Sequence, residues 1–167
     1  PYLGNHWAKS GYASVFIQHP GSDESVWKNK ERAQRYAALK EAANFRSSIH
    51  RYRDVPFVID QLEKWNLDEE HPLSGRFDLT RIGMSGHSYG ARTTQGMMGE
   101  DFQAGTNFRE PRITAFLPFS PSISKRLSPE KSFGHVKAPV LLMTGTKDGS
   151  AIDQNLDPNE RNKVILG

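Results

Sequence analysis

The chemistry of this sequence centres on one serine flanked by glycines, in the run Gly86-His87-Ser88-Tyr89-Gly90. This spacing suits a sharp turn between a strand and a helix, which holds the central serine in a strained backbone conformation. Glycine is favoured two residues away on either side, because a Cβ there would press on the neighbouring element. Such a turn exposes the hydroxyl and directs the first N–H groups of the helix at an anion formed beside it. We therefore predict that Ser88 is a nucleophile and that the backbone N–H of Tyr89 is an oxyanion donor; the alternative is a structural turn.

A nucleophilic serine needs a base, and the base needs a carboxylate that orients it. Asp148 is the candidate for this carboxylate, because it follows the apolar run of residues 139–143 through a short turn. The alternative is that Asp148 is a solvated turn residue before Gly149, a common pairing in loops. Asp153 and Asp157 are the next candidates in the same loop.

The base cannot be assigned with the expected chain order, which is serine, then acid, then histidine. All six histidines, at positions 6, 19, 50, 71, 87 and 135, precede Asp148. His87 adjoins Ser88, so its side chain is expected to point away from the hydroxyl, and His19 would invert the order. We therefore expect the base beyond Gly167 and the second oxyanion loop before Pro1, so that residues 1–167 alone would be inactive and marginally stable.

Strands and helices are predicted to alternate around these residues. Apolar runs of strand length, each closed by proline, glycine or polar residues, occupy residues 12–17, 81–84, 113–117 and 139–143. Helical patterns occupy residues 2–10, 28–43 and 54–65 and the stretch from Ser88 to Gly99. The alternation predicts βαβ units in a parallel sheet, with ligands beyond the carboxyl ends of the strands. His19, Ser88 and Asp148 each follow a predicted strand.

The helix before the serine motif has the clearest predicted boundaries. Asp54 suits the N-cap, and Pro56 in the first turn loses no hydrogen bond. Five apolar residues then recur at helical spacing and form one stripe: Val55, Val58, Ile59, Leu62 and Trp65. We expect this stripe to pack on the sheet.

The composition allows one packed domain, which we take as a single partial domain over residues 1–167. No apolar run approaches the roughly 18 residues that a membrane helix needs, so no transmembrane segment is predicted. The formal net charge is only +3, and the basic residues between 28 and 53 suit a solvated helix face, so no nucleic-acid partner is predicted. The absence of cysteine excludes thiolate nucleophiles, disulfides and cysteine-based zinc sites.

Four segments resemble segments of the α/β-hydrolase superfamily and occur in the same order. Within this superfamily, they are most similar to the group related to dienelactone hydrolases and platelet-activating-factor acetylhydrolases. They are Gln18-His19-Pro20-Gly21-Ser22-Asp23, Asp54-Val55-Pro56-Phe57-Val58-Ile59-Asp60-Gln61-Leu62, Gly86-His87-Ser88-Tyr89-Gly90-Ala91 and Leu141-Leu142-Met143-Thr144-Gly145-Thr146-Lys147-Asp148. The resemblance covers most of the chain, from residue 10 to about residue 150. It implies a three-layer α/β sandwich with a mostly parallel sheet, incomplete at both ends.

The same resemblance implies a serine hydrolase that cleaves a small-molecule carboxylic ester through an acyl-enzyme, with no metal or organic cofactor. Ser88 is then the nucleophile and Asp148 the triad acid. By analogy of fold, the candidate pocket-lining residues are His19, His87, Phe119 and Ser120. The alternatives are a non-catalytic binding module with this fold, or the same fold acting on thioesters or peptides. The sequence leaves the oligomeric state and the cellular compartment open.

Overall fold

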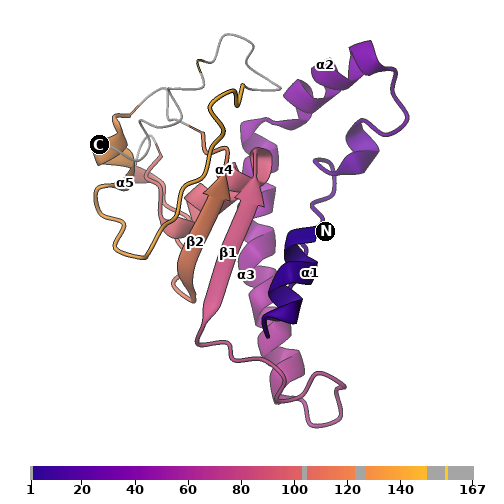
Figure 1. The fold of residues 1–167 in the computed structure, drawn as a ribbon, viewed down its shortest axis with the longest axis vertical. Helices are drawn as coiled ribbons and strands as arrows, with labels where there is room; N and C mark the ends of the chain where they lie inside the picture. Colours follow the sequence, from indigo (N-terminus) through magenta and orange to yellow (C-terminus); the bar gives the residue numbers. More distant parts are fainter. Residues whose placement is uncertain (1, 103–104, 123–126, 150–156, 158–167) are drawn as a thin grey trace.

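The computed structural model describes residues 2–102, 105–122, 127–149 and 157. These residues form a mixed α/β structure with a parallel sheet and five α-helices (Figure 1). In chain order the elements are α1 (Tyr2–Lys9), the 3-10 helix η1 (Glu24–Val26), α2 (Arg32–Ala42), α3 (Phe45–Leu67), β1 (Ile82–His87), α4 (Tyr89–Met98), β2 (Ile113–Phe119) and α5 (Pro129–Phe133). The helices predicted at residues 2–10, 28–43 and 88–99 are confirmed, with small differences in their bounds.

The sheet pairs β1 with β2 in parallel, and His87 lies opposite Phe119 at its carboxyl edge. Residues 139–143 continue this parallel ladder beyond β2 through two isolated bridges, Phe116 to Val140 and Phe119 to Met143. The N–H of Phe116 donates to the carbonyl of Pro139 at 3.0 Å. The predicted strands at 81–84 and 113–117 are confirmed, and the third predicted segment is present as a bridged extension of the sheet.

The prediction of a buried strand at residues 12–17 is wrong. This segment has no regular secondary structure, and Tyr12, Val15 and Phe16 are between 52% and 66% exposed. An apolar run forms a strand only where a neighbouring strand accepts its backbone hydrogen bonds. Within the described residues β1 pairs with β2 alone, so the run lacks a neighbour of this kind.

The N-cap of helix α3 lies ten residues earlier than predicted. Its N-cap is Asn44, whose side chain accepts a hydrogen bond from the N–H of Ser47 at 2.9 Å. Asp54 and Pro56 therefore lie inside the helix, and the predicted N-cap is wrong. Pro56 has no N–H to donate to the carbonyl of Tyr52 four residues before it, a loss that packing of the long helix has to offset.

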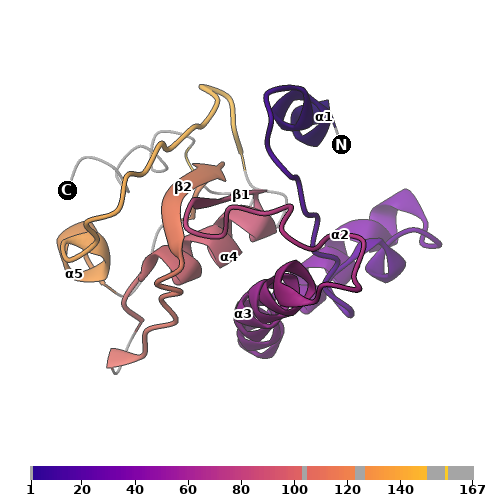
Figure 2. The ribbon, with the colours of Figure 1, turned by 90° about the horizontal axis from the view of Figure 1, so that it is seen from below.

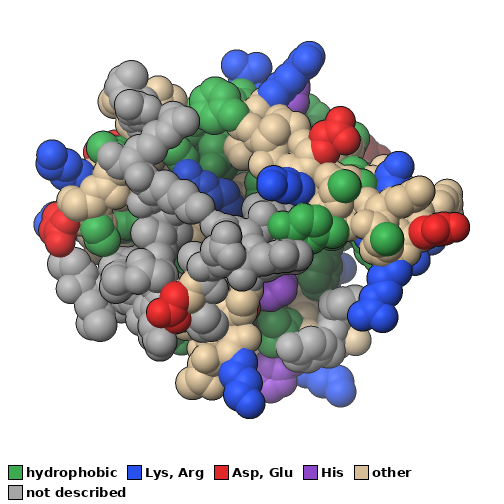
Figure 3. Space-filling model, turned by 90° about the horizontal axis from the view of Figure 1, so that it is seen from above, with side chains coloured by type: hydrophobic (Ala, Val, Ile, Leu, Met, Phe, Trp, Pro, Cys, Tyr) green, Lys and Arg blue, Asp and Glu red, His purple; other side chains and the backbone are tan. Residues whose placement is uncertain are grey.

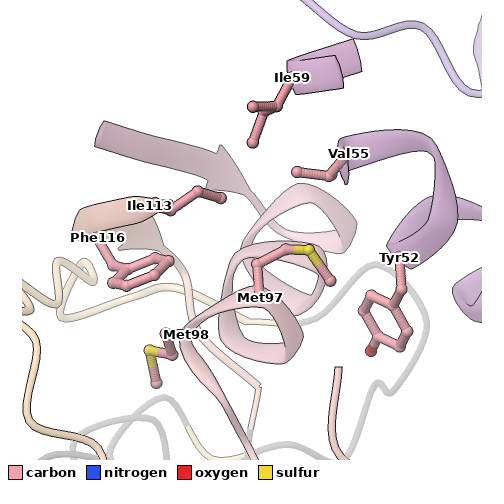
Figure 4. Close-up of a cluster of buried hydrophobic side chains, with 7 residues drawn as sticks. All are labelled: Tyr52, Val55, Ile59, Met97, Met98, Ile113 and Phe116. Carbon is pink, nitrogen blue, oxygen red and sulfur yellow. The ribbon is translucent and has the colours of Figure 1, made fainter. Parts of the chain in front are cut away.

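The hydrophobic core lies where α3, α4 and β2 meet (Figures 2 and 4). Its buried side chains are Tyr52, Val55, Ile59, Met97, Met98, Ile113 and Phe116. Of the predicted stripe on α3, Val55 and Ile59 are buried, whereas Trp65 is exposed and stacks on the ring of His71. None of the helices in the described residues is both long enough and apolar enough to cross a membrane.

Candidate active site

Ser88 is the single residue between the end of β1 and the start of α4. Its φ of 54° and ψ of −111° lie in a region that residues with a side chain rarely adopt. Its N–H donates to the carbonyl of Phe119 at 3.0 Å, which ties the turn to β2. The residue is exposed, and its hydroxyl does not cap the helix. The predicted strand–turn–helix arrangement is therefore present, with the serine hydroxyl at the surface.

The two glycines of the motif have different roles. A Cβ on Gly86 would lie 2.4 Å from the backbone carbonyl carbon and oxygen of Gly90, so a side chain at residue 86 would collide with the turn. A Cβ on Gly90 would meet nothing within 4 Å among the described residues. The steric prediction is confirmed for Gly86 and wrong for Gly90, because it is the backbone of Gly90 that approaches Gly86.

Tyr89 is the first residue of α4, so helix geometry gives its N–H no acceptor within the helix. This N–H belongs to the residue directly after Ser88, the position from which an oxyanion donor is expected. The side chain of Tyr89 is held against α3: its hydroxyl lies 3.2 Å from Ser48 Oγ and donates to the carbonyl of Asn44 at 3.2 Å. The contact fixes the start of α4 against the start of α3.

Asp148 follows the bridged segment at residues 139–143 in a short turn. Its N–H donates to the carbonyl of Gly145 at 3.1 Å, and its Oδ2 accepts a hydrogen bond from the hydroxyl of Thr144 at 2.9 Å. The segments that carry Ser88 and Asp148 run parallel, with β2 between them, and end at the same edge of the sheet. Ser88 thus follows a strand as expected, whereas Asp148 follows a segment that only isolated bridges join to the sheet.

The other predicted site residues differ in their distance from Ser88. Asp153 lies outside the described residues, and Asp157 is exposed. His87 and Phe119 face each other across the ladder directly before the serine turn. Ser120 follows β2 as Ser88 follows β1, with the same φ of 54°, but it is buried. His87, Phe119 and Ser120 are therefore close to Ser88 at the sheet edge.

His19 does not follow a strand, because residues 12–17 do not form one. It is buried, and its Nδ1 lies 2.7 Å from Oδ2 of Asp54 on α3. Burial lowers the pKa of His19, as does the nearby charge of Arg51, whereas the hydrogen bond to Asp54 acts in the opposite direction. His19 is thus paired with a carboxylate on α3, and Asp54 has this role instead of capping a helix.

Arg51 belongs to none of the sequence motifs, yet it lies at the centre of a polar cluster with Thr93, Ser22 and Tyr89. Its side chain is only 9% exposed, and its Nε donates to Thr93 Oγ1 at 2.8 Å and its Nη1 to Ser22 Oγ at 2.9 Å. Its guanidinium carbon lies 4.5 Å from the centroid of the Tyr89 ring, and desolvation lowers the pKa of Arg51. One sequence signal could have identified Arg51. It lies one helical turn before Val55, so a charged residue occupies the same face of the helix as the apolar stripe.

Figure 3 shows the molecule from the side toward which both strands point in Figure 1, where basic and histidine side chains reach the surface. Among the described residues, no group of three histidine, aspartate or glutamate side chains is placed to hold a metal ion. Comparison with protein-family models and with curated proteins found no match. The resemblance to α/β-hydrolases therefore stays a prediction from the sequence motifs.

Proposed function

We propose that this protein is a serine hydrolase of carboxylic esters with an α/β-hydrolase fold. The observation that carries the proposal is the backbone of Ser88, an exposed non-glycine residue with positive φ between a parallel strand and a helix. A strained serine at this junction is the arrangement of a nucleophile elbow. The fit of Gly86 against the backbone of Gly90 and the parallel order of the three sheet segments support the same proposal.

In this proposal Ser88 Oγ attacks the ester carbonyl carbon, and the alcohol leaves to give an acyl-enzyme that water hydrolyses. The N–H of Tyr89 donates to the oxyanion of the tetrahedral intermediate. Asp148 orients a histidine that takes the serine proton and passes it to the leaving alcohol. His19 does not fit this role, because it binds the carboxylate of Asp54 on a different element.

The test is covalent labelling with a fluorophosphonate, together with hydrolysis of a short-chain nitrophenyl ester, using protein made from the complete reading frame. We expect Ser88→Ala to abolish labelling and to lower turnover by about three to six orders of magnitude. Ser85→Ala is the matched control, because Ser85 lies in β1 three residues before the nucleophile and is expected to keep both activities. Labelling of Ser88→Ala at the wild-type level would refute the nucleophile. A folded wild-type protein without labelling or turnover would favour a non-catalytic binding module.

A further inference from the structure

A hollow of about 330 Å³ is lined by the segment between α1 and η1 and by Arg51 of α3, whose guanidinium also contacts Tyr89 at the start of α4. The lining residues are Phe16, Ile17, Gln18, His19, Ser22, Asp23, Glu24 and Arg51. Arg51 is more than nine-tenths buried and uses Nε and Nη1 for neutral hydroxyl acceptors. The carboxylate whose charge acts on Arg51 is that of Asp54, also on α3. Its Oδ2 already lies 2.7 Å from Nδ1 of His19. A guanidinium has five N–H donors, so Arg51 keeps capacity for an acidic ligand.

The hollow is connected to the serine turn through Arg51 and Tyr89. The guanidinium of Arg51 stacks on the Tyr89 ring, and the backbone N–H of the same tyrosine is the proposed oxyanion donor beside Ser88. Arg51 thus contacts both the hollow and the residue directly after the proposed nucleophile. We propose that the hollow binds a carboxylate carried by the substrate, which makes the substrate a half-ester of a short dicarboxylic acid; this substrate class rests on the proposed ester hydrolysis.

The charges around the hollow favour a carboxylate over a phosphate. Arg51 supplies one buried positive charge, and a guanidinium matches the two oxygens of a carboxylate in a forked pair of hydrogen bonds. Asp23 and Glu24 also line the hollow, so a dianionic phosphate would meet two negative groups against one buried cation. Glu24 is partly compensated by Lys28, whose Nζ lies 2.9 Å from Oε1 of Glu24. A singly charged group fits this balance.

The apolar residues of the lining suit the chain between carboxylate and ester. Phe16 is 66% exposed and Ile17 is half-buried, and both border the hollow. Methylene groups of a short diacid would cover part of this apolar surface while the carboxylate reaches Arg51. The exposed apolar segment that the sequence predicted as a strand thus acquires a role in binding.

The test measures binding by calorimetry in the Ser88→Ala protein, so that its outcome is independent of hydrolysis. The probe is monomethyl glutarate, and dimethyl glutarate is the matched uncharged compound. We expect the half-ester to bind at least about tenfold more tightly than the diester, because only the half-ester makes a charge-assisted pair with Arg51. Equal binding of the two, or no saturable binding of the half-ester, would overturn the proposal. Tighter binding of inorganic phosphate would overturn the choice of a carboxylate.

Two variants and one control identify the residue responsible. Arg51→Gln removes the cation, and we expect it to abolish the preference for the half-ester. Ser22→Asp places a carboxylate next to Nη1 of Arg51, where it should compete with the carboxylate of the ligand and likewise abolish the preference. Because this variant keeps Arg51 and gives its charge a partner, it serves as the test if Arg51→Gln fails to fold. Arg53→Gln removes the same charge from an exposed position on α3 and is expected to keep the preference. A folded Ser22→Asp protein with wild-type preference would refute the role of Arg51.

Discussion

Gly86 and Gly90 flank the serine symmetrically in sequence but not in space, and this difference gives a matched pair of substitutions. We expect Gly86→Ala to destabilise the protein by about 1–3 kcal/mol, because its Cβ would lie 2.4 Å from the backbone of Gly90 and the turn must shift. Gly90→Ala meets no atom within 4 Å in the described structure, and alanine suits the first turns of a helix, so stability should be kept. Urea denaturation measures both. Equal losses for the two variants would contradict this account of the turn.

His19 gives a prediction of pH dependence at the scale of a single residue. The pKa of His19 in the folded protein is lowered from its ordinary value of 6.5, with burial as the first cause. The unfolded chain therefore binds a proton at a higher pH than the folded chain. We expect the free energy of unfolding to fall as the pH drops below 6.5 toward the folded pKa, and to gain nothing from this group above 6.5.

An NMR titration of the His19 ring checks this shift directly. Asp54→Asn removes the carboxylate that favours the charged imidazole, so it should lower the pKa of His19 further. A pKa of His19 above 6.5 in the native protein would show that the pairing with Asp54 outweighs burial, contrary to the prediction.

At the scale of elements, the N-cap of α3 can be tested in the same way. The side chain of Asn44 accepts the N–H of Ser47 at 2.9 Å, so we expect Asn44→Ala to cost about 1 kcal/mol of stability. Asn44→Asp keeps an acceptor at the cap and adds a negative charge at the helix N-terminus, so it should keep stability. Thermal unfolding of the two variants distinguishes them. If the alanine variant unfolds at the wild-type temperature, the cap does not stabilise the helix.

Elements whose signals are local were predictable from the sequence. The turn at Ser88, the helix after it and the left-handed Gly99 at its end follow from glycine spacing and apolar runs next to each other in the chain. Two errors came from signals that depend on distant partners. Residues 12–17 look like a strand, but a strand needs a neighbour that the sequence does not identify. Asp54 looks like an N-cap, but its partner is His19, 35 residues away.

The residues of the candidate site also differ in whether their signals are local in the sequence. The sequence could predict that Ser88 and Asp148 lie at one edge of the sheet, because each comes after an apolar run that becomes part of the parallel ladder. Arg51 was missed because its partners come from the loop at Ser22, from Tyr89 and from Thr93. An arginine in line with the apolar stripe is visible in the sequence, but its burial and its contacts with Thr93 and Tyr89 depend on the packing of α3 on α4.

At the scale of the whole molecule, the packing of α3 on α4 brings Arg51 to Thr93 and Tyr89, and Gly96 lies at the contact between the two helices. A Cβ on Gly96 would lie 2.4 Å from the ring of Tyr52, which is a buried core residue of α3. We expect Gly96→Ala to destabilise the protein by about 1–3 kcal/mol, because the ring cannot move without displacing the aromatic rings of Phe102 and Phe108 packed against it.

A double-mutant cycle separates this close contact from a general effect on α4. Tyr52→Leu removes ring atoms where the new methyl group would enter, so Gly96→Ala should cost less in the Tyr52→Leu background than in the wild type. The difference is measured by urea denaturation of the four proteins. If it is zero, Gly96 does not set the distance between the helices. If the cost of Gly96→Ala is smaller in the Tyr52→Leu background, the Gly96→Ala protein should also lose the preference for the half-ester. The reason is that Arg51 lies one residue before Tyr52 on the helix that the new methyl group displaces.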